Sequence, residues 1–354
     1  MNDINNTIDF LAIGDVVNDD FIQLEESQAT VTCDANGNEC MISMNFGDKL
    51  PYHDRKLIYA VGNSPNGALG ATRLGLDTAL MTHVGNDELG QQTITAMEGR
   101  GINTDFVITE PEKTTNYHFV LRYKAERTIL IKHEAYTYDL AKQVEGKPTP
   151  KWIYFSSVGE DSMQYHKDIA QWVSDKNIKM AFQPGTFQIK LGYEPLKYIY
   201  EACELFFCNV EEAEKILGPV IGIDPITDKR ETTTRKQFTL FLMQEMSKLG
   251  PDTVCITDGP DGAYAYDGAH AWYMPTYPDP APPVDRTGAG DSFSSTFTSA
   301  LALGNDIPTA LSWGPINSMS VVQHVGAQEG LLTKEQLLEY LADAPEEYVA
   351  EQLM

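Results

Sequence analysis

Residues 284–293 read Val-Asp-Arg-Thr-Gly-Ala-Gly-Asp-Ser-Phe, and a run of small and apolar residues continues from there to Leu301. Because Gly288 and Gly290 can adopt positive φ and apolar residues recur at 293, 297 and 301, the stretch predicts a glycine-rich turn that opens a helix. Such a turn directs backbone N–H groups and the positive end of the helix dipole toward one point. We therefore expect the amides of Gly288, Ala289 and Gly290 to form an anion hole suited to a phosphate.

Asp291 follows the last glycine directly, and two interpretations of this carboxylate stay open. A carboxylate beside a bound phosphate would repel it, unless its task is to remove the proton from an attacking hydroxyl as a general base. Aspartate is also a good helix N-cap, which needs no ligand at all. The ten residues alone do not decide between them.

Composition limits the partners of this chain. Its 354 residues are 42 % hydrophobic, which suffices for one large domain or two ordinary ones. The formal charge of −25, from 51 acidic and 26 basic residues, argues against nucleic acid or an anionic membrane as partner. No apolar run approaches the roughly 20 residues of a membrane span, and the N-terminus lacks the features of a signal peptide. We expect a cytoplasmic protein.

Five cysteines without an export signal indicate reduced thiols, but one pair stands apart. Cys33 and Cys40 flank Asn36-Gly37, a two-residue hairpin signal that would set the two cysteines opposite each other. A cross-strand disulfide, a metal pair, or simply two half-buried strand residues would each fit this placement.

Short apolar runs alternate with helical stretches along most of the chain. Strand-like runs end near residues 13, 85, 155, 182 and 208, and repeated βα units of this kind indicate an α/β fold with a doubly wound, mostly parallel sheet flanked by helices. Residues 21–60 and 112–133 instead alternate short strands with turns. Such insertions fit a small β lid, which would exclude water from a reaction.

The stretch 285–293 resembles the C-terminal signature of the PfkB/ribokinase family of sugar and nucleoside kinases, usually Asp-Thr-Thr-Gly-Ala-Gly-Asp-x-Phe, with Arg286 as the one departure. Further motifs follow in the family's order from Gly14 to Gln328. The resemblance implies one ribokinase-like domain over residues 1–354, with the lid formed by about 21–60 and 112–133. It also implies that Asp291 is the catalytic base and that Gly288, Ala289 and Gly290 bind the transferred phosphoryl group.

Two motifs near the N-terminus resemble the substrate-binding parts of that family. Asp19 follows the first strand, where relatives carry an aspartate that holds sugar hydroxyls; a solvated loop is the alternative. Residues 61–75 resemble the signature Gly-Gly-x-x-x-Asn-x-Ala, which places Gly62, Asn63 and Asn66 at the substrate, although Val61 replaces the first glycine. Asn66 could equally serve as a helix cap.

The metal-binding residues that the resemblance implies are of two kinds. Asn209 and Glu212 match the family's Asn-x-x-Glu motif and would hold Mg²⁺ through water. Acidic residues in a first helical turn are the alternative, since they complement the helix dipole. Asp285 and Thr287, with a Gly-Ala loop at 326–327, match a monovalent-cation site, for K⁺, of some members.

The nucleotide side resembles the family as well. Thr257, Gly259 and Gly262 match a Thr-x-Gly-x-x-Gly loop that approaches ATP, where a side chain in place of glycine would block the way. Asn317 falls in the helix where relatives contact adenine. Gln183 stands where many relatives carry an aspartate, so this chain departs from the best-known sugar kinases.

We therefore expect an ATP- and Mg²⁺-dependent enzyme that transfers the γ-phosphate of ATP to a hydroxyl of a small sugar. The tract Glu126-Arg127-Thr128-Ile129 is typical of sugar-type members. The altered loop at 61–64 and Gln183 leave a nucleoside kinase as an alternative, and a non-catalytic nucleotide- or sugar-sensing protein is another. Because lid strands of this family often pair between subunits, a homodimer through the lid is also implied.

Overall fold

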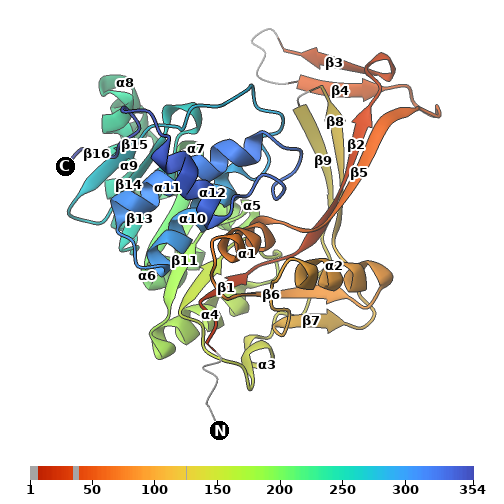
Figure 1. Ribbon diagram of the computed structural model, residues 1–354, viewed down its shortest axis with the longest axis horizontal. Helices are drawn as coiled ribbons and strands as arrows, with labels where there is room; N and C mark the ends of the chain where they lie inside the picture. Colours follow the sequence, from red (N-terminus) through yellow and green to blue (C-terminus); the bar gives the residue numbers. More distant parts are fainter. Residues whose placement is uncertain (1–6, 35–39, 125) are drawn as a thin grey trace.

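A ten-stranded sheet forms the centre of the computed structural model, which describes residues 7–34, 40–124 and 126–354 (Figure 1). Its strands, in order across the sheet, are β16 (Glu351–Gln352), β15 (Ala271–Met274), β14 (Ala263–Tyr266), β13 (Thr253–Thr257), β12 (Leu205–Asn209), β11 (Lys179–Phe182), β10 (Trp152–Phe155), β1 (Phe10–Ile13), β6 (Thr78–Gly85) and β7 (Val107–Glu110). The strands from β7 to β13 are parallel to their neighbours, whereas β14, β15 and β16 are added antiparallel.

Strand β1 shows why the sheet is covered on both faces. Phe10 and Ala12 belong to one hydrophobic core, and Leu11 and Ile13 belong to the other. Successive side chains of a strand point to opposite faces, so a continuous apolar run is stable only between two helical layers. The predicted α/β class with a mostly parallel, doubly wound sheet is confirmed.

The helices divide between the two cores. One face of the sheet packs against α1 (Asn63–Arg73), α2 (Glu88–Gly99), α10 (Ala289–Ala302), α11 (Ile307–Val322) and α12 (Lys334–Ala342). The other packs against α3 (Leu140–Val144), α4 (Met163–Lys176), α5 (Thr186–Leu191), α6 (Tyr193–Ala202), α7 (Val210–Ile221), α8 (Ile223–Thr232) and α9 (Arg235–Ser247). None of the helices in the described ranges is long and apolar enough to cross a membrane.

A second, smaller sheet projects from one edge of the molecule (Figure 1). Its order is β5 (Tyr52–Val61), β2 (Val17–Leu24), β8 (Tyr117–Tyr123) and β9 (Glu126–Lys132). Because β2 already begins at Val17, Asp19 lies within a strand of this sheet and not in a loop after β1. We call this four-stranded sheet the lid. Strands β5, β8 and β9 lie within the two stretches that the sequence indicated, whereas β2 begins before the first of them, at Val17.

A hairpin of β3 (Ala29–Cys33) and β4 (Cys40–Met44) lies at the far end of the lid, after the short 3₁₀ turn Glu26–Gln28. Cys33 and Cys40 are register partners in this hairpin and are joined by a disulfide. The Asn36-Gly37 turn expected between them lies outside the described residues. The disulfide is one of the three possibilities that the sequence left open for this pair. Reduced thiols were expected for the other cysteines, and Cys203, Cys208 and Cys255 are buried and unbridged.

Candidate active site

The start of α10 has the form that its glycines predict. Gly288 is the N-cap residue with φ of 83°, and a Cβ atom added there would lie 2.3 Å from the Cβ of Ala327. Within the described ranges, the backbone N–H groups of Gly288, Ala289 and Gly290 donate no hydrogen bond. These three amides at the positive end of a 14-residue helix are therefore available to an anion.

Asp291 does not cap its own helix, so the N-cap interpretation is wrong: Gly288 occupies that position and the carboxylate points elsewhere. Asn63 Nδ2 donates to Oδ1 of Asp291 at 2.8 Å, and Asn66 Nδ2 donates to Oδ2 at 2.8 Å. Gln183 Nε2 adds a third hydrogen bond to Oδ1, at 3.1 Å. Among the described residues, the carboxylate is thus fixed by three neutral donors and by no cation.

This environment makes Asp291 a stronger base than an ordinary aspartate. Burial raises its pKa, and the hydrogen bonds from Asn66, Gln183 and Asn63 counteract only part of that rise. A carboxylate with a raised pKa accepts a proton from an attacking hydroxyl more readily at neutral pH.

The first turn of α1 supplies two of these donors. It begins after Gly62, whose φ of 122° and close approach to the carbonyl oxygen of Asp15, 2.9 Å from an added Cβ, require glycine. Asn63 and Asn66, three residues apart, therefore share one face of the helix. Asn66 also accepts a hydrogen bond from Gln328 Nε2 at 2.9 Å, so its side chain positions the carboxylate here. Binding of substrate by Gly62, Asn63 and Asn66 stays a prediction.

Gln183 is a contact that sequence reasoning missed. Its Oε1 accepts hydrogen bonds from the hydroxyls of Tyr154 and Ser294, which orients its amide nitrogen toward Asp291. An aspartate at 183 would place a second negative charge beside the base. The departure from the family pattern thus has a direct electrostatic consequence.

A cavity of about 320 Å³ adjoins the glycine turn. Its walls come from the loop after β13, the start of α10 and one face of α11, and they include Thr257, Gly259, Gly262, Ala289, Gly290, Phe293, Pro315, Ser318, Met319 and Val322. Three residues predicted to approach ATP are thus brought together. Arg286 also lines the cavity and brings a positive charge to it. Ala289 and Gly290, the two residues before Asp291, line this cavity.

Asn317 is placed differently from its neighbours on α11. Its side chain is fully buried, Nδ2 donates to Thr296 Oγ1 at 2.8 Å, and Oδ1 accepts from the N–H of Leu332 at 3.0 Å. The amide therefore joins α10, α11 and the following loop. Ser318 and Met319, and not Asn317, are among the residues that line the cavity.

Asn209 and Glu212 form a reciprocal capping box at the start of α7. Asn209 Oδ1 accepts from the N–H of Glu212 at 2.8 Å, and Glu212 Oε2 accepts from the N–H of Asn209 at 2.9 Å. Burial raises the pKa of Glu212, and the negative charge of Asp291 contributes to that rise. The contacts of Asn209 and Glu212 are therefore those of residues that stabilise the start of a helix, the alternative given above. Binding of Mg²⁺ through water by these two residues stays a prediction.

Asp285 is bonded on both oxygens. Thr287 donates to Oδ1 from its N–H at 2.9 Å and its hydroxyl at 2.7 Å, and the N–H of Gly326 donates to Oδ2 at 3.0 Å. Although burial alone would raise the pKa of Asp285, these donors and the nearby Arg127 lower it. Arg127 of the lid, 3.8 Å from Oδ1, thus contacts the loop of the anion hole.

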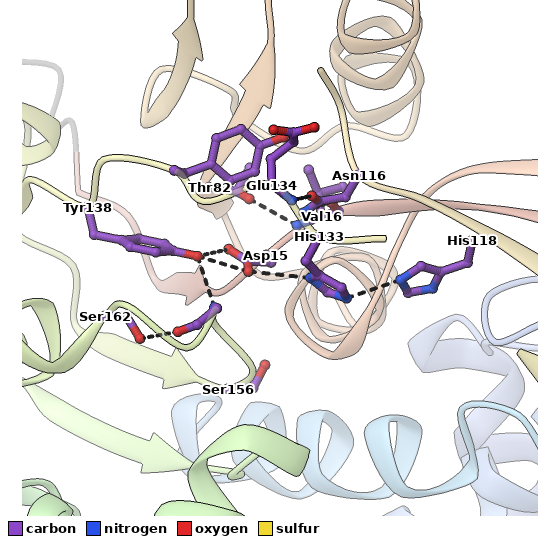
Figure 2. A network of polar contacts seen from close by, with 12 residues as sticks. Asp15, Val16, Thr82, Asn116, His118, His133, Glu134, Tyr138, Ser156 and Ser162 are labelled. Carbon is purple, nitrogen blue, oxygen red and sulfur yellow. Dashed lines mark hydrogen bonds and ion pairs between the residues drawn. The ribbon is translucent and has the colours of Figure 1, made fainter. Parts of the chain in front are cut away.

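A line of polar side chains at the base of the lid was missed by sequence reasoning. Figure 2 shows Tyr138, Asp15, His133 and His118 in succession. The hydroxyl of Tyr138 donates to both oxygens of Asp15, at 2.9 and 3.0 Å, and the Nε2 atoms of the two histidines are 3.1 Å apart. Asp19 lies at the end of this line, with Oδ1 at 3.2 Å from Nδ1 of His118.

Comparison with known proteins shows the family and the fold of this chain. Residues 47–334 match the model of the pfkB family carbohydrate kinases. A ribokinase of Bacillus subtilis is 25 % identical over 289 residues, covering 79 % of this chain and 87 % of that protein. An uncharacterized sugar kinase of Archaeoglobus fulgidus is 25 % identical over 272 residues, covering 74 % and 98 %.

Two solved structures share the fold at lower identity. The ribokinase of Arabidopsis thaliana, complexed with ribose and ATP, has a TM-score of 0.73 and 17 % identity over 95 % of this chain and 99 % of that one. The nucleoside kinase of Methanocaldococcus jannaschii has a TM-score of 0.71 and 18 % identity, over 96 % and 99 %.

The doubly wound sheet, the glycine turn and the buried carboxylate beside it define an α/β phosphotransferase. The chain belongs to the pfkB family of carbohydrate kinases, since the family model covers most of its length. It is an ATP-dependent kinase with a sugar or nucleoside as its class of substrate.

Proposed function

We propose that this kinase transfers the γ-phosphate of ATP to a hydroxyl of a small sugar, with Asp291 as general base. The observation that carries the proposal is the placement of one carboxylate, raised in pKa, beside three unpaired helix-terminal amides. Asp291 takes the proton of the acceptor hydroxyl as that oxygen attacks phosphorus in line. The N–H groups of Gly288, Ala289 and Gly290 bind the negative charge on the transferred group.

ATP fits the cavity between the loop after β13 and α11. Thr257, Gly259 and Gly262 support its phosphates and ribose, Arg286 adds a positive charge, and the apolar wall of Phe293 and Met319 suits the base. Asn317 acts on adenine only indirectly in this proposal, by fixing α11.

Two cation sites complete the proposal. Both partners of the capping box keep lone pairs for the water shell of Mg²⁺, which neutralises phosphate charge when it is bound near Asn209 and Glu212. Asp285 and Thr287 are the proposed site of a monovalent cation such as K⁺. The side-chain oxygens of Asp285 already accept three hydrogen bonds, so backbone carbonyls must supply most ligands there.

We also propose that two copies of the chain associate through their lids. Strand β9 is the edge of the lid sheet, all of its described residues are exposed, and it carries Ile129, Leu130 and Ile131. A long apolar edge strand is unusual in a monomer, because it offers an unpaired backbone and an apolar face to other chains. A second copy of the same edge would cover both.

The mechanism is tested with Asp291→Ala. We expect a loss of phosphorylation of about 10²–10⁴-fold, the usual contribution of a general base, with unchanged folding and ATP binding. ATP consumption is measured against a panel of sugars and nucleosides, and ATP affinity by calorimetry. Asp105→Ala, at a carboxylate bonded to Asn103, is the matched control. Unchanged turnover in Asp291→Ala would reject the mechanism, and wild-type protein that binds ATP but phosphorylates no compound would favour the sensing protein.

A further inference from the structure

The loop at 326–329, between α11 and α12, connects the lid to the start of α10. On the lid side, Glu329 forms an ion pair with Lys56 of β5. A Cβ atom added to Gly326 would lie 2.7 Å from Cδ1 of Ile58, so β5 also packs directly against the loop backbone. The same loop contacts the turn that precedes α10. The position of the lid is therefore linked to the anion hole through this loop.

Gln328 lies in the middle of these contacts and is almost fully buried, with an exposed fraction of 5 %. One hydrogen of its Nε2 group goes to the carbonyl oxygen of Ala60, near the end of β5, at 2.8 Å, and the other goes to Oδ1 of Asn66 at 2.9 Å. Asn66 in turn donates from Nδ2 to Asp291. One amide group therefore links a lid strand to a residue that holds the base.

The two ends of this line fix the direction of every hydrogen bond in it. An ionised aspartate only accepts, so Asn66 turns its Nδ2 toward Asp291 and its Oδ1 toward Gln328. A main-chain carbonyl oxygen also only accepts. Gln328 must therefore present its nitrogen to both partners, which leaves its Oε1 buried without a partner in the described part of the chain. A leucine would fill the same space without that cost, so packing alone does not account for a glutamine here.

Ala60 is held in a conformation that alanine rarely adopts. Its φ is 57°, in the left-handed region, and its exposed fraction is 1 %. Its N–H donates to Asn18 Oδ1 at 3.0 Å, and its carbonyl oxygen accepts from Gln328 and, at 3.3 Å, from Nη1 of Arg100. Such strain persists only where the surroundings impose it. The end of β5 is thus a strained junction between the lid and α1, and Gln328 is one of the groups that hold it.

We propose that Gln328 is a positioning residue that couples the docked lid to the base. With the lid docked, Gln328 is bonded to both Ala60 and Asn66, and Asn66 directs its Nδ2 at Asp291. When β5 leaves the loop at 326–329, Gln328 loses one of the two partners that place it, and the amide of Asn66 can turn away from the carboxylate. The base is then oriented only under a docked lid, which limits transfer of phosphate to water in the open site. This inference rests on the proposed kinase function.

The test uses two single variants, their combination and a control. Gln328→Leu removes both hydrogen bonds and keeps the size of the side chain. Ile58→Ala loosens the lid at its contact with Gly326. Ile22→Ala is the matched control, because Ile22 is also a half-buried isoleucine of the lid. It follows Phe21, whose ring lies toward Gly326, so Ile22 points to the opposite face of the lid.

The rates kcat and kcat/KM are measured from about pH 4 to 9 with an acceptor from the panel used for Asp291→Ala, and melting curves confirm folding. Gln328→Leu should lower kcat about tenfold. It should also move the acidic limb of the pH profile of kcat/KM to higher pH by about half a unit, because Asp291 loses much of a hydrogen bond that favours its ionised form. The KM for ATP should change by less than about twofold.

The combined variant tests the coupling itself. Ile58→Ala should move kcat and the acidic limb in the same directions as Gln328→Leu, with a loss in kcat of about threefold. The double variant should be no worse than Gln328→Leu alone, since the lid acts on the base through this residue. Ile22→Ala should keep the wild-type kcat and the wild-type limb.

Three results would count against these expectations in different ways. A wild-type acidic limb in Gln328→Leu would overturn the inference, and so would losses in kcat that multiply in the double variant, because independent effects add in free energy. If Gln328→Leu does not fold, the limb of Ile58→Ala decides, and a limb at the wild-type pH overturns the inference. Wild-type protein that phosphorylates no compound of the panel would instead overturn the kinase function, on which the inference depends.

Discussion

Three amide side chains hold Asp291, and this replaces the cation that usually fixes a buried carboxylate. The difference matters because a lysine or arginine would lower the pKa of the base strongly, whereas neutral donors lower it less. Burial therefore keeps the pKa of Asp291 above the ordinary value. The carboxylate is oriented and still basic.

The acidic limb of the pH–activity profile should report this balance. The proposed mechanism requires an ionised Asp291, so it predicts that kcat/KM falls as pH falls through the pKa of this carboxyl group. Asn63→Ala removes a hydrogen bond that favours the ionised form, which raises the pKa further and moves the limb to higher pH. A shift of about one unit is expected, since 1.36 kcal/mol corresponds to one pKa unit and such a bond contributes about that much.

The measurement is kcat/KM from about pH 4 to 9. Asn103→Ala, which removes a bond to a different carboxylate, Asp105, should leave the limb in place. Movement of the limb to lower pH in Asn63→Ala would contradict the assignment of Asp291 as the titrating base.

The sequence alone predicts the surroundings of Asp291 far better than the contact between His118 and His133. Asp291 and its glycines could be predicted because one continuous stretch of sequence encodes turn, helix start and carboxylate. The pair His118 and His133 could not, because their contact depends on how β8 and β9 pair with β2, and Asp15 is over a hundred residues away in the chain. The N-cap alternative for Asp291 failed because Gly288 already fills that position.

At the scale of elements, α10 depends on the conformation of its first residues. Gly288 combines positive φ with backbone contact to Ala327, whereas Gly290 has ordinary helical φ and open space, its nearest neighbour being Gln183 Nε2 at 3.9 Å from an added Cβ. The same substitution at these two glycines should therefore have opposite effects on stability.

Gly288→Ala should lower the free energy of unfolding by at least about 1–2 kcal/mol, the cost of a left-handed conformation for a residue with a Cβ. Gly290→Ala should leave it unchanged or slightly higher, since alanine favours a helix. Urea denaturation of both variants gives the comparison. If Gly288→Ala and the wild-type protein had the same free energy of unfolding, the prediction would be wrong, because the turn would then accept a Cβ atom at position 288 without strain.

Elements of the sheet were predictable, whereas the beginning of the lid was not. Apolar runs such as Phe10–Ile13 indicate buried parallel strands whatever their neighbours are. Strand β2 carries Asn18, Asp19 and Asp20, residues that are rare in strands, and tertiary pairing with β5 and β8 overrides that preference.

At the scale of the whole molecule, exposed apolar side chains gather on the lid. The lid and its hairpin carry Val31, Met41, Met44, Phe46, Tyr52, Phe119, Ile129, Leu130 and Ile131 at the surface. The formal charge of −25 makes most of the chain's surface well suited to water. A concentration of apolar side chains on one projecting sheet therefore stands out and is typical of a surface that binds a partner. Contact between two lids would remove it from water.

Leu130→Asp tests that contact. Leu130 is 52 % exposed on the edge strand and pairs with Phe119, on the face of the lid opposite to His118. Sedimentation equilibrium of wild-type protein should give twice the mass of the chain. Leu130→Asp should give a single chain at concentrations where the wild type is a dimer, because a carboxylate on each copy is buried without a partner.

Leu338→Asp, at a comparably exposed leucine of α12, should remain dimeric. A wild-type protein that is monomeric at every concentration, or equal dissociation of both variants, would place the interface away from β9.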